Sequence, residues 1–551
     1  MIYPAFANAN ITDTLRIESP EIEVVGFDSE YAKNKLKSLS RKGEKLYINI
    51  AKESTRRTTY IEKANRYTDE KYLMDISADG GVVNVSITVS GRKSLYRAIN
   101  RIVSMINCGE ILLGSVEDYP LFENRGYIEG FYGKPWTNAN RKEMIEFLSF
   151  YGMNAYYYAP KDDPYHRSKW QELYPAEELA QLKSLVDLCN DNFVEFGYCI
   201  APGQSMIYSS QEDFEKLCAK TKQLFDAGVR RFGLLVDDIP ENLYYEQDKI
   251  AFDYEAVNAH IDLANKLNSY IKNLSGDCRL TVCPLQYHGK GNEYYISKLG
   301  KSIDGDISLF WTGRNICSQE LTVPEAVIFN DSTNRKPLYW DNFPVNDAEM
   351  YNEMHLGYLS GRDADLYRYS KGIVSNTMQY SSSSKIPLLT VCDYLWNPEK
   401  YSGFDSWKKA LEIVFADECE LIMPFADNLL TSCLKVENSP MLNAALGKAE
   451  QHFFAGDIDS AKEVMLNYIS SLGDCCNYLK TVDNSIVSEL MPWAEKQFMA
   501  LDLLKNALSL LENNSSENKE KTAELLAEYL NHPKTLCDFS LQAFTERMLT
   551  L

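Results

Sequence analysis

Long apolar runs and runs of basic residues are both missing from this 551-residue sequence. No stretch approaches the roughly 20 consecutive apolar residues that a membrane helix requires, so we expect no membrane partner. Acidic residues outnumber basic ones by 78 to 57, which gives a formal charge of −21. A surface this acidic repels a phosphate backbone and no basic run offsets it, so we expect no nucleic-acid partner either.

Cysteine spacings typical of metal or redox motifs are also missing. The 13 cysteines are scattered and include no Cys-x-x-Cys pair. The neighbours Cys475 and Cys476 do not suit a zinc knuckle, so we expect mostly buried thiols in a reducing compartment. The N-terminus, which begins MIYPAF, lacks the basic head and long apolar run of a signal peptide. These features favour a cytoplasmic protein, and secretion stays open if a leader precedes this sequence.

The chain is too long for a single hydrophobic core, and we predict three parts. Residues 1–120 have the pattern of a small α/β domain, with β-branched strands at 46–50 and 82–89 and a helix at 94–106. Residues 405–551 lose the strand pattern. Apolar residues recur there at steps of three and four between Leu490 and Leu511, which predicts a helical bundle.

Between residues 121 and 404, strand-like and helix-like segments alternate. This alternation predicts a parallel sheet, and eight units in roughly 280 residues fit a (β/α)8 TIM-type barrel. A doubly wound open sheet is the alternative. The eight strand candidates begin near Gly126, Asn154, Glu195, Arg231, Arg279, Asp306, Pro337 and Lys371.

Two adjacent aspartates, Asp237 and Asp238, directly follow an apolar strand candidate at 232–236. The carboxyl end of a parallel strand is where α/β folds place their chemistry. Neighbouring carboxylates repel, so one holds its proton to higher pH, and the pair supplies an acid and an anion, as glycoside cleavage requires. Both side chains reach one ligand only if the strand ends near Asp237, because neighbours on a regular strand face opposite ways. Helix capping and metal binding are the alternatives.

The other predicted strands also end in glycines, aromatic rings, amides and charges, as a carbohydrate pocket requires. The residues that stand at these ends are Gly130, Lys161, Tyr287, Thr312, Trp340, Asn342, Asp347 and Asn376. Asp162, Asp163 and His166 offer a metal-site alternative, but a capped or ion-paired loop is the better interpretation and we predict no metal. No Gly-x-Ser-x-Gly elbow, phosphate-binding loop or dinucleotide motif is present.

Two motifs closely resemble glycoside hydrolase family 84: EGFYGKPW at 129–136 and APKDDPYH at 159–166. The Asp237-Asp238-Ile239 run and the segment 340–347 also match the family's motifs in the expected order. This family contains the retaining β-N-acetylglucosaminidases of the O-GlcNAcase type. The resemblance implies a (β/α)8 barrel enzyme that needs no cofactor. Its substrates would be GlcNAc-bearing proteins or glycans, and the flanking order resembles bacterial members.

The resemblance also implies a role for each matching residue. Asp237 would orient the substrate acetamide, and Asp238 would be the general acid and then the general base of a substrate-assisted reaction through an oxazoline. Tyr287 would assist the acetamide oxygen, and Trp340 and Thr312 would line the acetyl pocket. The sugar contacts would come from Gly130, Lys161, Asn342, Asp347 and Asn376. The chain departs from the family pattern at Val236 and Thr377, which places the fine shape of the pocket in question.

Three other functions remain open from the sequence. A hexosaminidase or hyaluronidase acting on free glycans would share the same chemistry. A catalytically silent carbohydrate-binding protein would share the pocket, although the intact Asp237-Asp238 pair argues against it. A metal-dependent hydrolase is the third possibility. The sequence leaves the oligomeric state and the role of the C-terminal helices undecided.

Overall fold

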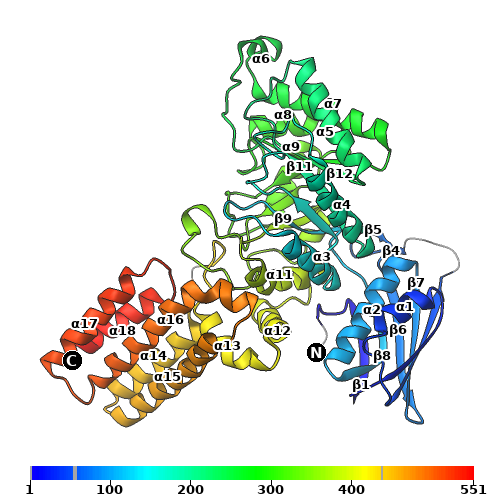
Figure 1. The fold of residues 1–551 in the computed structure, drawn as a ribbon. Coiled ribbons are helices and arrows are strands. Elements are labelled where there is room, and N and C mark those ends of the chain that lie inside the picture. The colour runs from blue at the N-terminus through cyan, green and yellow to red at the C-terminus, as the bar shows by residue number, and fades with distance from the viewer. Residues whose placement is uncertain (1–2, 54–58, 436–437, 551) are drawn as a thin grey trace.

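The computed structural model describes residues 3–53, 59–435 and 438–550. Figure 1 shows three parts: an N-terminal sheet with two helices, a central barrel, and a C-terminal group of helices. The N-terminal part and the C-terminal helices both adjoin the barrel, the first near α3 and the second near α11. No helix among the described residues combines the length and apolarity needed to cross a membrane.

The N-terminal part is built on a six-stranded mixed sheet with the order β1-β8-β6-β7-β3-β2. Helices α1 (Ser29–Leu36) and α2 (Arg92–Asn107) pack their apolar faces into its core. Gly80 and Gly81 both have positive φ, and they form the turn between β6 and β7. The strands are β1 (Asn8–Arg16), β2 (Glu21–Gly26), β3 (Lys45–Lys52), β6 (Tyr72–Asp79), β7 (Val82–Val89) and β8 (Glu110–Asp118), with a separate hairpin of β4 (Thr59–Ile61) and β5 (Arg66–Thr68).

Eight parallel strands close into a barrel in sequence order, from β9 to β16 and back to β9. The (β/α)8 prediction is confirmed, and the open-sheet alternative is wrong. Each strand begins within about two residues of its predicted start. They are β9 (Asn124–Glu129), β10 (Ala155–Tyr158), β11 (Glu195–Ile200), β12 (Arg231–Leu235), β13 (Arg279–Cys283), β14 (Ser308–Trp311), β15 (Leu338–Asp341) and β16 (Gly372–Asn376).

Side chains fill the barrel interior, and they alternate large and small across neighbouring strands. The ring of Tyr157 on β10 lies against Gly197 on β11, where an added Cβ would come 2.7 Å from the ring. The outer layer is made by α3 (Asn138–Phe150), α4 (Ala176–Asp191), α5 (Gln211–Asp226), α6 (Glu246–Ala251), α7 (Ala256–Leu274), α8 (Tyr294–Ser302), α9 (Val323–Thr333), α10 (Leu366–Tyr369) and α11 (Ser381–Trp396). This packing leaves the carboxyl ends of the strands as the rim on which loops build a site.

The C-terminal helices share one hydrophobic core, as the apolar spacing predicts. Leu490, Leu504 and Leu508 of the predicted stripe are buried in it. The last helix pair begins at Ser516, the first residue of α17, where the Ser515 hydroxyl accepts from the Asn518 N–H and caps the helix. The helices are α12 (Gly403–Phe415), α13 (Cys419–Asp427), α14 (Pro440–Phe454), α15 (Ile458–Thr481), α16 (Ser485–Ser509), α17 (Ser516–Asn531) and α18 (Asp538–Thr550).

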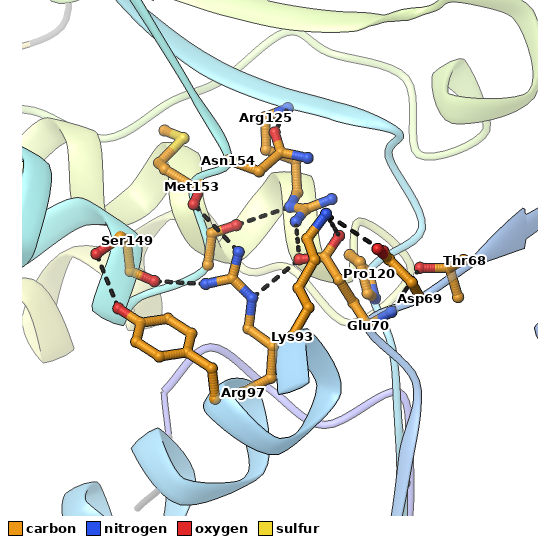
Figure 2. Close-up of polar contacts among 12 residues, drawn as sticks. Thr68, Asp69, Glu70, Lys93, Arg97, Pro120, Arg125, Ser149, Met153 and Asn154 are labelled. Atoms are coloured by element: carbon orange, nitrogen blue, oxygen red, sulfur yellow. Dashed lines mark hydrogen bonds and ion pairs between the residues drawn. The ribbon is translucent and has the colours of Figure 1, made fainter. Parts of the chain in front are cut away.

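A buried ion-pair network joins the N-terminal part to the barrel (Figure 2). Glu70 Oε1 accepts from Arg97 Nε at 2.9 Å and from Arg125 Nη2 at 2.6 Å. Arg97 also donates to the carbonyls of Ser149 and Met153, so a side chain of α2 is hydrogen-bonded to the C-terminal end of α3 and to the loop after it. Burial alone would raise the pKa of Glu70, but Arg125, Lys93 and Arg97 outweigh it and hold that pKa well below its usual range.

We predict that Glu70→Gln lowers the unfolding free energy by roughly 3 kcal/mol at pH 7, because it leaves two buried guanidinium groups without their anion. A depressed pKa contributes stability that is present above the ordinary carboxyl range and is lost as pH falls through the folded-state pKa. The deficit of the variant therefore shrinks below about pH 4.5. Urea unfolding at several pH values measures it. Glu30→Gln, at an exposed pair with Lys33, is the control and changes stability little. An equal loss in both variants contradicts the prediction.

Candidate active site

The chain leaves the barrel wall after Leu235, and only Val236 separates that strand end from the two aspartates. Asp238 has φ of +52°, a left-handed conformation that turns the chain. The predicted end of the strand is therefore confirmed. Lys161 Nζ, from the loop after β10, lies 4.0 Å from Asp237 Oδ2 and 3.5 Å from Asp238 Oδ2. One ammonium group thus faces both carboxylates, which converge on the same space.

The two carboxylates differ in exposure, 11% for Asp237 and 34% for Asp238. Burial raises the pKa of Asp237; the Lys161 charge opposes this rise and the Asp238 charge adds to it. Burial would lower the pKa of Lys161, but Asp237, Tyr132 and Asp238 outweigh it and the pKa is raised. Lys161 therefore remains a cation at neutral pH, and it is the group that most favours an ionised Asp237.

Tyr132 is a site residue that the sequence analysis did not single out. Its hydroxyl donates to Asp238 Oδ2 at 2.9 Å, and its backbone N–H donates to Asp347 Oδ2 at 2.7 Å. The Lys161 ammonium lies 5.1 Å from the centre of its ring. Tyr132 lies within the EGFYGKPW motif at 129–136, and its place in that motif is the one signal for it in the sequence. Tyr132 thereby links three of the predicted residues.

A second group of predicted residues forms an amide network beside this pair. Asn342 Oδ1 accepts from Trp340 Nε1 and from Asn376 Nδ2, each at 3.0 Å. Asn376 Oδ1 in turn accepts from the Gly130 N–H at 3.2 Å. The four residues come from the ends of β9, β15 and β16. These three hydrogen bonds run in series, so the Trp340 ring is oriented by Asn342, which is in turn oriented by Asn376.

Tyr287 and Thr312 lie on adjacent loops at the same rim. The Thr312 N–H donates to the Tyr287 carbonyl at 2.9 Å, and the Thr312 hydroxyl donates to the Asn315 carbonyl at 2.7 Å. Thr312 therefore shapes its loop. Burial raises the pKa of the Tyr287 hydroxyl, and the charges of Asp238 and Asp237 raise it further. That hydroxyl stays protonated at neutral pH, so it is available as a hydrogen-bond donor.

Two of the three residues considered for a metal site, Asp163 and His166, have structural partners. Asp163 accepts from the hydroxyls of Tyr158 and Tyr174 at 2.8 and 2.6 Å, which fits the loop interpretation. His166 is buried with Nδ1 2.6 Å from the Cys199 carbonyl, and burial lowers its pKa to about 4. Within residues 3–53, 59–435 and 438–550, no group of three or more His, Cys, Asp or Glu side chains is arranged to hold a metal ion.

The C-terminal helices contact the loop that carries Asp347. The Asn352 carbonyl accepts from Trp493 Nε1 at 2.9 Å and from the Thr535 N–H at 3.0 Å. Nearer the strand end, Cys433 Sγ donates to the Asn342 carbonyl at 3.1 Å. The sequence left the role of the C-terminal helices undecided. These contacts show that the C-terminal part binds the backbone of the loop after Asp347 and the backbone at Asn342.

Comparison with known proteins agrees with this geometry. Residues 125–427 match the family described as beta-N-acetylglucosaminidase. The Protein O-GlcNAcase of Rattus norvegicus and that of Mus musculus are each 33% identical over 257 residues, 46% of this chain and 27% of theirs. The matched region thus spans about a quarter of these relatives' length. An O-GlcNAc hydrolase mutant of Thermobaculum terrenum superposes with a TM-score of 0.74 at 31% identity, covering 78% of this chain and 94% of that one. The structure named CpGH84B covers 100% of both chains with a TM-score of 0.83 at 25% identity.

The contact between Gly130 and Trp340 leaves no room for a side chain. A Cβ at Gly130 would come 2.6 Å from Trp340 Cζ2 and 3.1 Å from Asn376 Oδ1. We predict that Gly130→Ala costs about 1–3 kcal/mol of stability through overpacking and lowers the melting temperature. Gly276→Ala is the matched control, because nothing lies within 4 Å of its added Cβ. Thermal unfolding of both variants checks this; an unchanged melting temperature for Gly130→Ala contradicts the close approach.

Proposed function

The chain belongs to the beta-N-acetylglucosaminidase family, and from this premise we propose that it hydrolyses terminal β-linked N-acetylglucosamine from glycoproteins and other glycoconjugates. The reaction proceeds with retention, and the substrate's own acetamide is the nucleophile. The observation that carries the proposal is the convergence of Asp237 and Asp238 on Lys161 at one barrel rim, next to the ordered ring of Trp340.

A neutral amide oxygen is a weak nucleophile, so its position over the anomeric carbon must be fixed in advance. Trp340, held through Asn342, is placed to wall the acetyl group, and the protonated hydroxyl of Tyr287 is available to donate to the amide oxygen. Attack within one molecule then avoids the entropy cost of bringing two reactants together. The proposed role of these two residues is to hold that conformation.

Asp237 is the proposed partner of the acetamide N–H. Positive charge develops on the amide as the oxazoline forms, and an ionised carboxylate beside the N–H stabilises it. Burial works against ionisation of Asp237, so the fixed charge of Lys161 is what keeps the anion available. A buried anion is also more effective than an exposed one, because less water screens it.

Asp238 is the proposed general acid and base. It is the more exposed carboxylate of the pair, so it is the one more accessible to a leaving group that extends into solvent. Its proton goes to the departing glycosidic oxygen, and the resulting anion is stabilised by the Tyr132 hydroxyl and by Lys161. The same anion then takes a proton from the water that opens the oxazoline.

The hydroxyl groups of the sugar would be held by the amides and by Asp347. Asn376 and Asn342 are fixed relative to one another, and Asp347 is anchored by the Tyr132 N–H. These groups come from the ends of β9, β15 and β16. We propose that they bind one terminal sugar of a larger aglycone, such as a GlcNAc-bearing protein. All 13 cysteines are free, which supports a reducing, cytoplasmic setting as part of the proposal.

The test is hydrolysis of aryl N-acetyl-β-glucosaminides whose leaving groups differ in pKa. We predict that wild type is active and that Asp237→Ala lowers kcat/KM by about a hundredfold or more across the series. Asp238→Ala slows substrates with poor leaving groups by about 10²–10⁴ and substrates with good ones far less, because a good leaving group needs little protonation. A silent binding protein gives no activity, and equal losses across the series remove Asp238 as the acid.

A further inference from the structure

Arg362 lies between β15 and β16 in the chain and uses all five of its N–H donors. Its Nε and Nη2 donate to the two carboxylate oxygens of Asp341, at 2.9 and 2.6 Å. The other three hydrogen bonds end on the carbonyls of Gln319, Ser360 and Ser318. The side chains of Arg362 and Asp341 are only 1% and 3% exposed. A bidentate pair of this kind fixes both the distance and the orientation of its partners.

Asp341 connects this arginine to the strand end that carries two predicted site residues. It is the last residue of β15 and stands between Trp340 and Asn342. Side chains alternate along a strand, so Trp340 and Asn342 share one side and Asp341 faces the other. The hydrogen bond from Trp340 Nε1 to Asn342 Oδ1 agrees with this alternation. Arg362 therefore holds the strand end from the side opposite the Trp340 ring.

Arg362 also holds the loop that supplies a partner to Asn342. Asn342 Nδ2 donates at 2.8 Å to the carbonyl of Ile316, in the loop after β14. Two and three residues farther along this loop, the carbonyls of Ser318 and Gln319 accept from Arg362 at 3.1 and 2.8 Å. One buried side chain thus fixes both ends of the hydrogen bond from Asn342 to Ile316.

We propose that Arg362 is a positioning residue for the reaction: by holding Asp341 and the 316–319 segment, it sets the place of the Trp340 ring against the substrate acetamide. Arg362 acts only through these neighbours. The kinetic effect of Arg362 rests on the function proposed above, whereas its effect on the Trp340 ring does not.

A second buried arginine provides a matched control at the other end of the same strand. Arg335 precedes β15, and it also donates five hydrogen bonds, all to backbone carbonyls, within 300–307 and at Thr333. Lysine has three donors, so Arg335→Lys and Arg362→Lys each leave at least two buried acceptors without a donor. Both variants lose stability for the same reason, but only Arg362 contacts the strand end beside Trp340.

The kinetic experiment uses the whole chain, an aryl N-acetyl-β-glucosaminide, and a temperature well below the melting temperature of each variant. We expect Arg362→Lys to lower kcat by about tenfold or more with a smaller change in KM, because attack by the amide oxygen depends on its exact placement. Arg335→Lys keeps kcat within about twofold of wild type. An unchanged kcat in Arg362→Lys overturns the proposal, and so does an equal fall in both variants.

The position of the Trp340 ring is measured without any substrate. The seven tryptophans are replaced by 5-fluorotryptophan, and the ¹⁹F signal of Trp340 is assigned by its loss in Trp340→Phe. We expect this signal to shift or broaden in Arg362→Lys and to stay in place in Arg335→Lys. A Trp340 signal that is the same in wild type and Arg362→Lys overturns the proposal, even in an active enzyme. A wild-type protein without hydrolytic activity instead overturns the function proposed above.

A milder variant tests the same inference if Arg362→Lys does not fold. Asp341→Asn keeps the shape of the side chain but sets an NH₂ donor against a guanidinium donor, so it removes one of the two hydrogen bonds of the pair. We expect a smaller fall in kcat and a smaller change in the Trp340 signal, both in the same direction. A folded Asp341→Asn variant with wild-type kcat and a wild-type Trp340 signal overturns the proposal.

Discussion

The arrangement of this site depends on the free-energy cost of burying the charge of Asp237. Asp237 sits where burial penalises its anion, and a second carboxylate follows it directly in the chain. A cation placed against both groups favours the anion there, and Lys161 supplies that cation from the next strand but one. The left-handed turn at Asp238 and the end of β12 at Leu235 follow from it, because a continued strand would separate the two side chains.

The rest of the molecule holds that arrangement rigid. The Glu70 network fastens the N-terminal sheet to β9 and α3, at the base of the strand that leads to Gly130 and Tyr132. Trp493 and Thr535, which belong to the C-terminal part, hold the loop after Asp347 by hydrogen bonds to the Asn352 carbonyl. Both attachments use backbone carbonyls as acceptors, so they fix loop position directly. A reaction that depends on placing a weak nucleophile needs such support, since small displacements are costly.

The repeating pattern of the barrel was readable from the sequence because each β/α unit carries its own local signal. Each strand start lies within a single β/α unit, and so does each polar strand end. The adjacent pair of Asp237 and Asp238 likewise belongs to one unit. What escaped prediction depends on contacts between units. Tyr132 acquires its partners from Asp347 and Asp238, which are distant in the chain.

The central claim is that a bound sugar's own amide performs the displacement within the box of Trp340 and Tyr287. Its most direct test compares aryl glycosides that differ only in fluorination of the N-acetyl group, from none to three fluorines. Fluorine withdraws electrons from the amide oxygen without much change in size. The account predicts that kcat/KM falls steeply with each fluorine, by at least about tenfold over the series. Rates that do not respond to fluorination would contradict it.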